Sequence, residues 1–531
     1  MKLYDYIFLL LLAAALFVRI SYFDWPLGEG GADSSRDYII ASKILNDKAR
    51  PGFGPDSGFG TYNSPSYYYL LAFFLWIRND FIFLQYVNIL LQTAVILLLY
   101  ALTRSAFGQP AALLTTGLFA FSEPIIRQSL HVWQPYVMQF FFYLAILFLL
   151  LAYRKQNYRY LLSSLVMIIV AGSLHLSAFA MFPLIFIANL FLLKSWKASL
   201  DHYIGIVAAA GSSFLLLFGT IFSSIGFSRP AIKTNISEVL WHLPFWQKLI
   251  SEFYSLLTLP FKMILFSFGN SRHDNLDIKY LVILGVLICG YCFFQKSREK
   301  RMILMTVLGL LIQPAFWLSV ATASSPEIGL NIQSHHFTPV FGLLFILAIV
   351  PIADMLSQNR FATMIAIILL FSQIVWPGMI SAQAWASNPK HKQNYQHLAQ
   401  AAHAIEEKVN ELHTEQHLEN FRFFQLTVYR SGSNLVSDML FWNVLEQDMK
   451  YPFVYITQRG EHIINDDQYI FLVCLEHQDI PYPAKQCLQD FREAKHIQNV
   501  NDRSNYAVLD KIYSESPFTI FLTKKTSISG P

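Results

Sequence analysis

The chain has 531 residues, of which 54% are hydrophobic and only 14% are charged, and its formal net charge is +4. A soluble globular protein carries about 25% charged residues, so this composition excludes an ordinary soluble protein and indicates a membrane protein. The small net charge gives no indication of nucleic-acid binding, and four cysteines are too few for a disulfide-based scaffold.

Long apolar runs recur along residues 1–380. A transmembrane helix needs about 20 predominantly apolar residues, and about eleven runs approach that length. The first run, near Tyr6–Ile20, lacks a small-residue cleavage site, so we expect it to remain as an uncleaved span. The apolar stretch Tyr160–Leu193 is too long for one helix, and we divide it at Gly172–His175. The other spans are expected near Phe81–Thr103, Ala111–Ser122, Tyr136–Ala152, Tyr203–Phe222, Lys279–Phe294, Met302–Val320, Phe337–Leu356 and Phe361–Ile380.

The positive charges between these spans predict the orientation of the chain. Lysine and arginine are enriched on the cytoplasmic side of membrane proteins. The basic residues fall on one side: Lys2, Arg104, Arg154, Lys155, Arg159, Lys194, Lys197, Lys296, Arg298, Lys300, Arg301 and Arg360. We therefore expect a cytoplasmic N-terminus, and external loops at residues 21–80 and 223–278. The segment Pro65–Ile77 has roughly 13 residues, is too short to cross comfortably, and is expected at the membrane interface.

The polar tail, residues 381–531, is expected to form a separate periplasmic domain. It opens with a helical pattern over Asn394–His417 and continues with short runs that are typical of strands. The expected strands are Phe421–Val428, Phe453–Thr457, Tyr469–Cys474 and Phe518–Thr523. The sequence therefore predicts an all-α polytopic membrane domain over residues 1–380, followed by a small soluble α/β domain.

The first external loop contains the most informative charged residues. Asp33 and Asp37 are four residues apart and would share one face of a helix, with Arg36 between them in the sequence. They follow directly after the first span, so they are expected close to the membrane surface. A carboxylate in this place could act as the base that removes a proton from an acceptor hydroxyl. The alternative is structural, because aspartate is also favoured near a helix N-terminus as a cap.

A glycine- and proline-rich turn at Gly52–Gly60 follows, and then the segment Asn63–Leu71 with three consecutive tyrosines. The turn residues predict a shaped loop. The tyrosines, of which Tyr67 is the first, suit a helix at the membrane interface, and they could also stack on a sugar.

The order of these elements resembles the GT-C superfamily of membrane glycosyltransferases. The elements are a first span, an external loop with Asp33, a Gly-Pro turn, and the Pro-x-Tyr-Tyr-Tyr-Leu-Leu segment from Pro65. Within the superfamily the chain is similar to family 39, which includes protein O-mannosyltransferases and the lipid A aminoarabinose transferase. The resemblance in order and sidedness covers residues 1–380, and it implies a GT-C fold for the membrane domain.

The resemblance also implies a reaction. A sugar would be transferred with inversion from a polyprenyl-phosphate donor, such as undecaprenyl phosphate, to a lipid, glycan or protein acceptor at the periplasmic face of a bacterial inner membrane. Asp33 matches the catalytic aspartate of the family. The family's acidic pair is often Asp-Glu, whereas Ser34 follows Asp33 here, and Asp37 is the nearest candidate for a second acid. The family's His-Pro-Pro turn is replaced by Ser64-Pro65-Ser66.

Histidines stand at the external ends of several predicted spans. His131 lies in a Ser-Leu-His-Val-Trp-Gln-Pro segment similar to a Trp-Asn-Pro element of the family, and His175 lies in an external hairpin. A lipid phosphate needs cationic or hydrogen-bonding partners at that depth. The residues expected to bind the donor phosphate or sugar are Arg36, Tyr67, His131, His175, His335 and His336.

Each histidine also has a structural interpretation, as a hydrogen-bonded interfacial side chain or a helix-end residue. The adjacent His335 and His336 do not share a helix face, so they are not a metal motif by their spacing. A divalent metal site built from His175, His336 and an acid is an open alternative. No cofactor is indicated with certainty.

Two other functions are compatible with a polytopic membrane protein. A polymerase or ligase of surface polysaccharide would depend on large external loops rich in arginine and histidine. A transporter or flippase for a lipid-linked sugar would be expected to carry charges within its spans and inverted repeats, and neither feature is evident in this sequence.

Overall fold

The computed structural model describes residues 3–21, 31–46, 48–55, 62–79, 81–211, 246–247, 249–250, 290–324, 338–356, 380, 400, 403–405, 407–412, 414, 421–427, 453–456, 469–475, 506–515 and 518–525. The side chains of some residues in these ranges, including Asp33, lie outside the description. The chain divides into two compact units. The helical unit contains residues 1–23 and 40–385, and the sheet unit contains residues 24–39 and 386–531.

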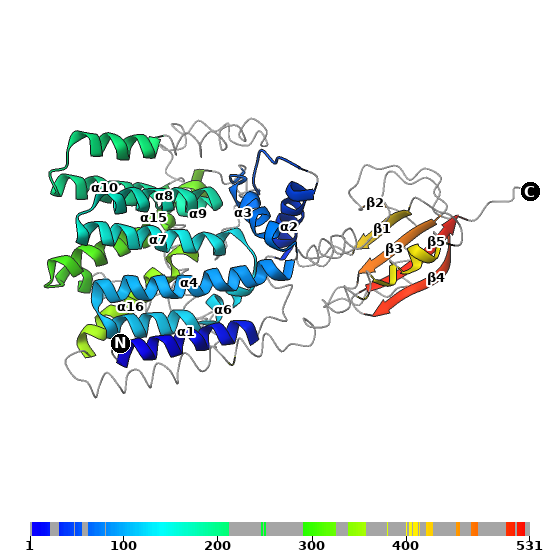
Figure 1. The fold of residues 1–531 in the computed structure, drawn as a ribbon, viewed down its shortest axis with the longest axis horizontal. Helices are drawn as coiled ribbons and strands as arrows, with labels where there is room; N and C mark the ends of the chain where they lie inside the picture. Colours follow the sequence, from blue (N-terminus) through cyan, green and yellow to red (C-terminus); the bar gives the residue numbers. More distant parts are fainter. Residues whose placement is uncertain are drawn as a thin grey trace, which may run out of the picture. The chain divides into compact units, whose positions relative to one another are not determined.

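The helical unit is built from long apolar helices that lie roughly side by side (Figure 1). Three of the described helices are long and apolar enough to cross a membrane, namely α1, α4 and α7, and several shorter apolar helices accompany them. The chain is therefore a multi-pass membrane protein. The helices of this unit are α1 (Leu3–Ser21), α3 (Ser66–Ile77), α4 (Phe81–Phe107), α5 (Gln109–Phe121), α6 (Glu123–Leu130), α7 (Gln134–Lys155), α8 (Tyr158–Leu174), α9 (Leu176–Phe179), α10 (Phe182–Ser195), α15 (Arg298–Ser324) and α16 (Phe341–Leu356). A further helix, α2 (Gly31–Asn46), has its first part in the sheet unit and its last part in the helical unit.

Glycine and proline set the boundaries between consecutive helices. Gly108, between α4 and α5, has a φ of 95°, which a residue with a Cβ rarely adopts. Proline stands in the first turn of α5, α6, α7 and α10, where its missing N–H would have no helical partner. His175 ends α8 with an extended backbone, so the long apolar stretch divides at the predicted place.

The core of the helical unit forms where α7 packs on α8 and where α4 packs on α5 and α7. Arg19, near the end of α1, is completely buried in this core. Its guanidinium donates hydrogen bonds to the carbonyl oxygens of Ala15, at 2.9 Å, and Ala120, at 3.0 Å. Ala120 belongs to the last turn of α5, where carbonyl groups lack helical partners and a positive charge is favoured. The buried charge therefore ties α1 to α5.

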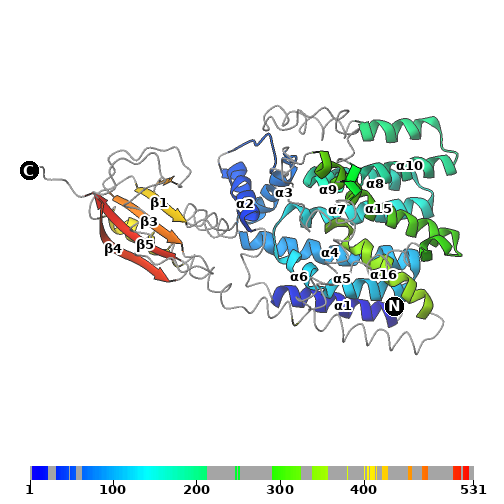
Figure 2. The same cartoon turned by 180° about the vertical axis from the view of Figure 1, so that it is seen from behind.

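Charged side chains pair at the end of the helical unit where the chain begins. Asp5 of α1 meets Arg104 of α4 at 2.9 Å, and Arg154 of α7 meets Glu299 of α15 at 2.8 Å. We call this the N-terminal end of the helical unit. Helices α3 and α6 lie at the opposite end in both views (Figures 1 and 2). The basic residues Arg104 and Arg154 therefore gather on one side of the unit, as the charge pattern predicts.

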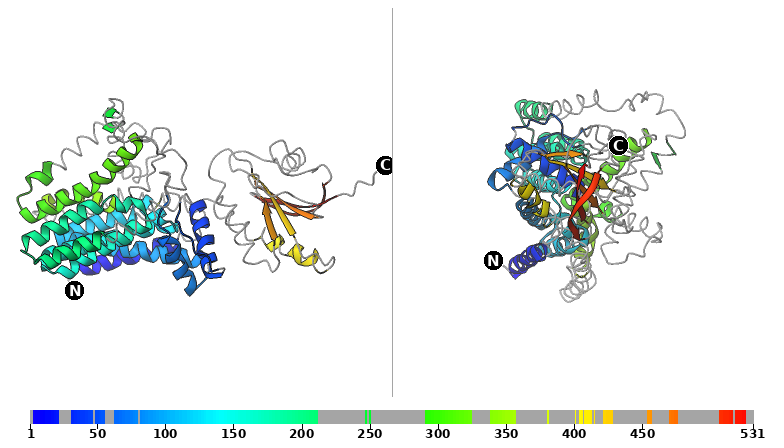
Figure 3. Two further views of the ribbon diagram at one scale, coloured as in Figure 1. Left: turned by 90° about the horizontal axis from the view of Figure 1, so that it is seen from above. Right: turned by 90° about the vertical axis from the view of Figure 1, so that its right-hand side faces the viewer.

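The described residues of the sheet unit form a five-stranded sheet, drawn in yellow to red in Figure 3. They are β1 (Phe421–Thr427), β2 (Phe453–Ile456), β3 (Tyr469–Leu475), β4 (Tyr506–Glu515) and β5 (Phe518–Lys525), and their order in the sheet is β2-β1-β3-β5-β4. β1 pairs in parallel with β2 and β3, whereas β5 pairs antiparallel with β3 and β4. The sheet is therefore mixed.

The four predicted strand segments coincide with β1, β2, β3 and β5, whereas β4 is absent from the sequence prediction. Its pairing with β5 is irregular between Val508 and Asp510 and again between Lys511 and Tyr513. The total of about eleven spans and the soluble character of the tail stay predictions, since several predicted spans lie wholly or partly outside the described residues.

Candidate functional site

The acidic residues that follow the first predicted span lie on helix α2. Asp33 and Asp37 are one turn apart on this helix, and the position of the Asp33 side chain is outside the description. Asp37 is completely buried. Arg36 donates hydrogen bonds from Nε and Nη2 to Oδ1 of Asp37, at 2.9 and 2.7 Å. A buried carboxylate requires such a partner, so Arg36 and Asp37 form a charge-balanced pair.

The turn before α3 is held by backbone hydrogen bonds. The Gly54 N–H donates to the Asn63 carbonyl, and the Asn63 N–H donates to the Pro55 carbonyl, each at 2.8 Å. The Asn63 side chain donates a further bond to the Pro55 carbonyl at 3.2 Å. These contacts close the loop between Gly54 and Asn63 and fix the start of α3.

The three consecutive tyrosines of α3 have different environments. Tyr67 and Tyr68 are 0% and 2% exposed, whereas Tyr69 is 42% exposed. Helix α3 packs against α4 and α8, so burial of Tyr67 follows from helix packing. A sugar could reach the Tyr67 ring only after neighbouring groups move, whereas Tyr69 is already accessible.

A buried polar cluster lies where α4, α6 and α7 meet. Asn88 of α4 directs its side-chain amide at three carbonyl oxygens, those of Gln128 at 3.2 Å, Ser129 at 2.9 Å and His131 at 2.7 Å. These carbonyls belong to the last turn of α6 and the residue after it, where helical partners are missing. Asn88 is 1% exposed and thereby fixes the end of α6.

Two glutamines extend the polar cluster along α4 and α7. Gln92 donates to the Tyr136 carbonyl at 2.6 Å. Gln139 donates to the Thr338 carbonyl at 2.7 Å and to the side-chain oxygen of Gln128 at 3.3 Å. Gln92 and Gln139 are completely buried, as is Thr338. The cluster therefore joins segments that lie about 200 residues apart in the sequence.

His131 is part of this cluster and is 5% exposed. Its ring stacks near Tyr136, with 6.4 Å between centroids, and Trp133 meets Tyr136 edge-on at 5.4 Å. Burial first, and the positive charge of Arg127 second, lower the pKa of His131 to about 4. The imidazole is therefore neutral at pH 7 and could offer a phosphate a hydrogen bond but no charge.

His175 lies in the turn between α8 and α9 and is 6% exposed. Its Nδ1 lies 2.7 Å from the Ser177 hydroxyl and accepts a bond from the Ser177 backbone N–H at 3.3 Å. A backbone N–H can only donate, so the neutral ring carries its proton on Nε2. Through these bonds His175 stabilises the turn between α8 and α9. This is the structural role that the sequence offers as an alternative to phosphate binding.

His335 and His336 lie outside the described residues, and the description resumes at Thr338. Among the predicted site residues, the structure brings Arg36 to Asp37 and sets His131 into the polar cluster. Across the described residues there is no group of three or more histidine, cysteine or acidic side chains that could hold a metal ion.

The sequence reasoning missed Asn88, Gln92 and Gln139. A signal for the first two exists, because Gln85, Asn88 and Gln92 recur at helical spacing within an otherwise apolar span. Such a polar stripe predicts a buried face that meets polar partners, although it does not identify them.

Three comparisons relate this geometry to known proteins. Residues 62–221 match the family described as dolichyl-phosphate-mannose-protein mannosyltransferase. No curated protein matches the sequence. The matched segment includes Tyr67, Asn88, His131 and His175, whereas Asp33 precedes it.

The fold resembles that of ArnT from Cupriavidus metallidurans. The apo structure aligns with a TM-score of 0.55 at 12% identity, and the structure bound to undecaprenyl phosphate aligns with a TM-score of 0.52 at 13% identity. Each alignment covers 100% of both chains. The chain therefore shares the fold of ArnT.

A weaker likeness extends to the oligosaccharyltransferase AglB from Archaeoglobus fulgidus, in complex with an inhibitory peptide and a dolichol-phosphate. The TM-score is 0.46 at 15% identity, and the alignment covers 80% of this chain and 63% of the AglB chain. The chain therefore spans less than two thirds of the length of AglB.

Proposed function

We propose that this chain is a glycosyltransferase that moves a sugar from a polyprenyl-phosphate donor to an acceptor at the periplasmic face of a bacterial inner membrane. The reaction inverts the configuration at the transferred sugar carbon. Undecaprenyl phosphate is the lipid of the donor, and the acceptor is a hydroxyl or amine on a lipid, a glycan or a protein.

The observation that carries this proposal is the shared fold with ArnT over the full length of both chains, including a structure with bound undecaprenyl phosphate. The family match adds a second line of support, because its description names a sugar donor linked to dolichyl phosphate. Dolichyl and undecaprenyl phosphate present the same chemistry to a protein, a phosphate at the end of a long polyprenyl chain.

Asp33 is the general base in this proposal. Its carboxylate takes the proton of the acceptor O–H or N–H while the acceptor atom forms a bond to the sugar carbon. The bond between that carbon and the phosphate oxygen breaks, and the polyprenyl phosphate leaves with the electron pair. Asp37 is the less suitable base, because it is buried and already paired with Arg36.

The departing phosphate gains negative charge and must be stabilised by hydrogen bonds or cations. We assign this role to the histidines of the external segments, His131, His175, His335 and His336. His131 is neutral at pH 7, since burial and the charge of Arg127 lower its pKa to about 4, and it serves as a hydrogen-bond donor. Arg36 contributes indirectly, because it holds Asp37 in position. The Asp37 carboxylate balances the charge of Arg36.

The proposed orientation has support from the pairing of charges. The basic residues Arg104 and Arg154 lie at the N-terminal end of the helical unit, and positive charge favours the cytoplasm. The polar cluster around Asn88 and His131 belongs to the other ends of α4 and α7. That end therefore faces the periplasm in this proposal, together with the tail domain, which contributes to acceptor binding.

Reconstitution of the purified chain in liposomes tests the proposal. The liposomes receive radiolabelled undecaprenyl-phosphate sugars and a membrane extract as the source of acceptors. Formation of a labelled product with a new glycosidic bond, in amounts that depend on the chain, supports the transferase. Movement of label across the bilayer without a new bond would contradict it and favour the flippase.

A further inference from the structure

Helix α2 is shared between the two compact units of the chain. Its first part, residues 31–39, belongs to the sheet unit together with residues 386–531, and its last part, residues 40–46, belongs to the helical unit. Asp33, the proposed base, lies in the first part. The segment that carries this aspartate is therefore grouped with the tail of the chain rather than with the membrane helices.

The first part of α2 has little helical stability of its own. It contains Gly31, Asp33, Ser34, Ser35 and Asp37, which are all residue types of low helix propensity. Glycine loses more backbone entropy in a helix, and serine and aspartate form local hydrogen bonds that compete with the helical ones. Such a segment stays helical in a protein chiefly through tertiary packing.

The packing of this part of α2 is visible in its buried face. Ser34, Asp37 and Tyr38 are 4%, 0% and 1% exposed. Their spacing of three and four residues places them on one side of the helix. Because residues 24–39 form one compact unit with residues 386–531, we expect the tail to supply the packing that stabilises this face.

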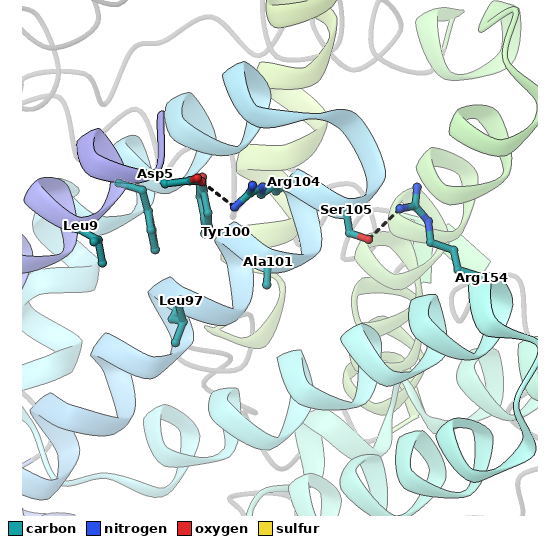
Figure 4. Close-up of a pocket in the computed structure, with 9 residues that line it drawn as sticks. Asp5, Leu9, Leu97, Tyr100, Ala101, Arg104, Ser105 and Arg154 are labelled. Atoms are coloured by element: carbon teal, nitrogen blue, oxygen red, sulfur yellow. Dashed lines mark hydrogen bonds and ion pairs between the residues drawn. The ribbon is translucent and has the colours of Figure 1, made fainter. Parts of the chain in front are cut away.

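The helical unit is held together by contacts of its own. Arg104 of α4 pairs with Asp5 of α1 at 2.9 Å, and Arg154 of α7 donates to the Ser105 hydroxyl of α4 at 3.0 Å (Figure 4). These contacts join α1, α4 and α7 without a residue of α2 or of the sheet unit. Local unfolding of the sheet unit is therefore expected to leave them in place.

We propose that the sheet unit stabilises the helical conformation of residues 31–39 and thereby controls the use of Asp33 as the base. When the sheet unit unfolds locally, this part of α2 loses its packing, and the helix that carries the aspartate is no longer formed. The tail is in this way a part of the catalytic apparatus. The catalytic consequence rests on the proposed function, whereas the structural coupling does not.

Hydrogen–deuterium exchange of the full-length chain in liposomes tests the structural coupling. Leu522 of β5 is 1% exposed, and β5 lies between β3 and β4, so Leu522→Ala removes packing from the interior of the sheet. The proposal predicts that amide exchange rises about 30-fold or more in β3, and by a similar factor in residues 31–39. Exchange in α4 and α7 is expected to stay at the wild-type rate.

Ile520→Val is a second, milder variant in case Leu522→Ala prevents folding of the sheet. Ile520 is completely buried in the same strand, and this substitution removes only one methylene group. It is expected to raise exchange by about two- to tenfold in both β3 and residues 31–39.

Two controls separate the coupling from general effects of substitution. Lys511→Ala changes an exposed side chain of β4 and is expected to leave exchange in residues 31–39 unchanged. Leu344→Ala makes the same change as Leu522→Ala at a residue of α16 that is 1% exposed. It is expected to raise exchange in α16 and in α5, which packs on it, but not in residues 31–39.

Wild-type protection of residues 31–39 in Leu522→Ala, together with raised exchange in β3, would overturn the proposal. An increase in residues 31–39 that is as large in Leu344→Ala as in Leu522→Ala would also overturn it. In that case, general destabilisation of the protein would explain both increases.

Sugar transfer from undecaprenyl-phosphate donors tests the catalytic consequence. The temperature at which Leu522→Ala loses half of its transfer rate is expected to lie about 10 °C below that of the wild type. Continued transfer by this variant at temperatures where residues 31–39 are unfolded would contradict the role assigned to the tail. Absence of transfer by the wild type at every temperature would instead refute the proposed function, and the exchange measurement alone would then decide the coupling.

Discussion

Arg36 donates hydrogen bonds from two of its nitrogens to a single oxygen of Asp37, at 2.9 and 2.7 Å, and the Asp37 side chain is completely buried. Neighbouring residues on a helix usually point in different directions. The long arginine side chain nevertheless reaches the adjacent carboxylate. The pair therefore stabilises α2 around Asp37, one turn after Asp33.

Removal of the Arg36 side chain is expected to destabilise the folded protein for this reason. Arg36→Ala leaves a buried carboxylate without its cation and should lower the free energy of unfolding by about 3 kcal/mol. The double variant with Asp37→Asn has no buried charge and should recover part of that loss. Thermal unfolding of the two single variants and the double variant measures the coupling. Additive losses would show that the two side chains do not depend on each other.

Gly54 is expected to tolerate no side chain. A Cβ at this position would collide with the Ser64 carbonyl oxygen and would lie 2.7 Å from the Asn63 carbonyl oxygen. Both are backbone atoms of the closed loop, which cannot move without breaking its hydrogen bonds. Gly54→Ala should therefore destabilise the loop by about 1–3 kcal/mol. Limited proteolysis of the loop measures the effect.

Gly52→Ala is the control for this substitution, because a Cβ at Gly52 meets nothing within 4 Å. Gly52 lies two residues before Gly54 in the same turn, and its substitution adds the same methyl group. Equal protease sensitivity of the two variants would contradict the proposed steric reason.

Among the polar residues of α4, Asn88 is expected to destabilise the protein most when it is substituted. Its amide serves three backbone carbonyls at the end of α6, so Asn88→Ala should cost about 1–3 kcal/mol of unfolding free energy. Asn88→Asp should cost more, because an ionised carboxylate only accepts hydrogen bonds and would repel those carbonyls. Asn46→Ala, at an exposed position of α2, is the control. A milder effect of Asn88→Asp than of Asn88→Ala would contradict this account of the cluster.

His131 predicts a dependence of stability on pH. Its pKa is about 4 in the folded protein, because of burial first and of Arg127 second, and about 6.5 in the unfolded chain. The unfolded chain therefore binds the proton first as the pH falls. The contribution of the neutral ring is complete above about pH 6.5, and it is lost between about pH 6.5 and pH 4 at up to about 1.4 kcal/mol per unit.

Unfolding measured between pH 7.5 and pH 5 in wild type and His131→Gln checks this prediction. The variant should show a flatter dependence on pH, since it has no ring to protonate. If the stability of His131→Gln depended on pH as steeply as that of the wild type, His131 would be ruled out as the source of the pH dependence.

Much of the fold could be predicted from local patterns, because apolar length determines spans and alternation determines strands. The division of the long apolar run at His175 followed from a local cluster of small and polar residues. Strand β4 could not be predicted, because two irregularities in its pairing near Asp510 and Lys511 break the alternation that identifies a strand.

The candidate site shows a different limit. Asp33 could be selected because of its place after the first span, whereas the partners of Asn88 lie 40 to 43 residues away and depend on how α4 packs on α6. The polar stripe on α4 predicts a polar neighbour but not its identity. The lowered pKa of His131 likewise arises from burial, which a sequence pattern does not give.

Sugar transfer from radiolabelled undecaprenyl-phosphate donors, measured for the wild type beside Asp33→Asn, tests the central claim most directly. Asp201→Asn, at an exposed carboxylate outside the candidate site, is the control. The account predicts a loss of about 10²–10⁴ in transfer rate for Asp33→Asn, with normal unfolding, and no loss for the control. Full transfer by a folded Asp33→Asn variant would contradict the assignment of Asp33 as the base.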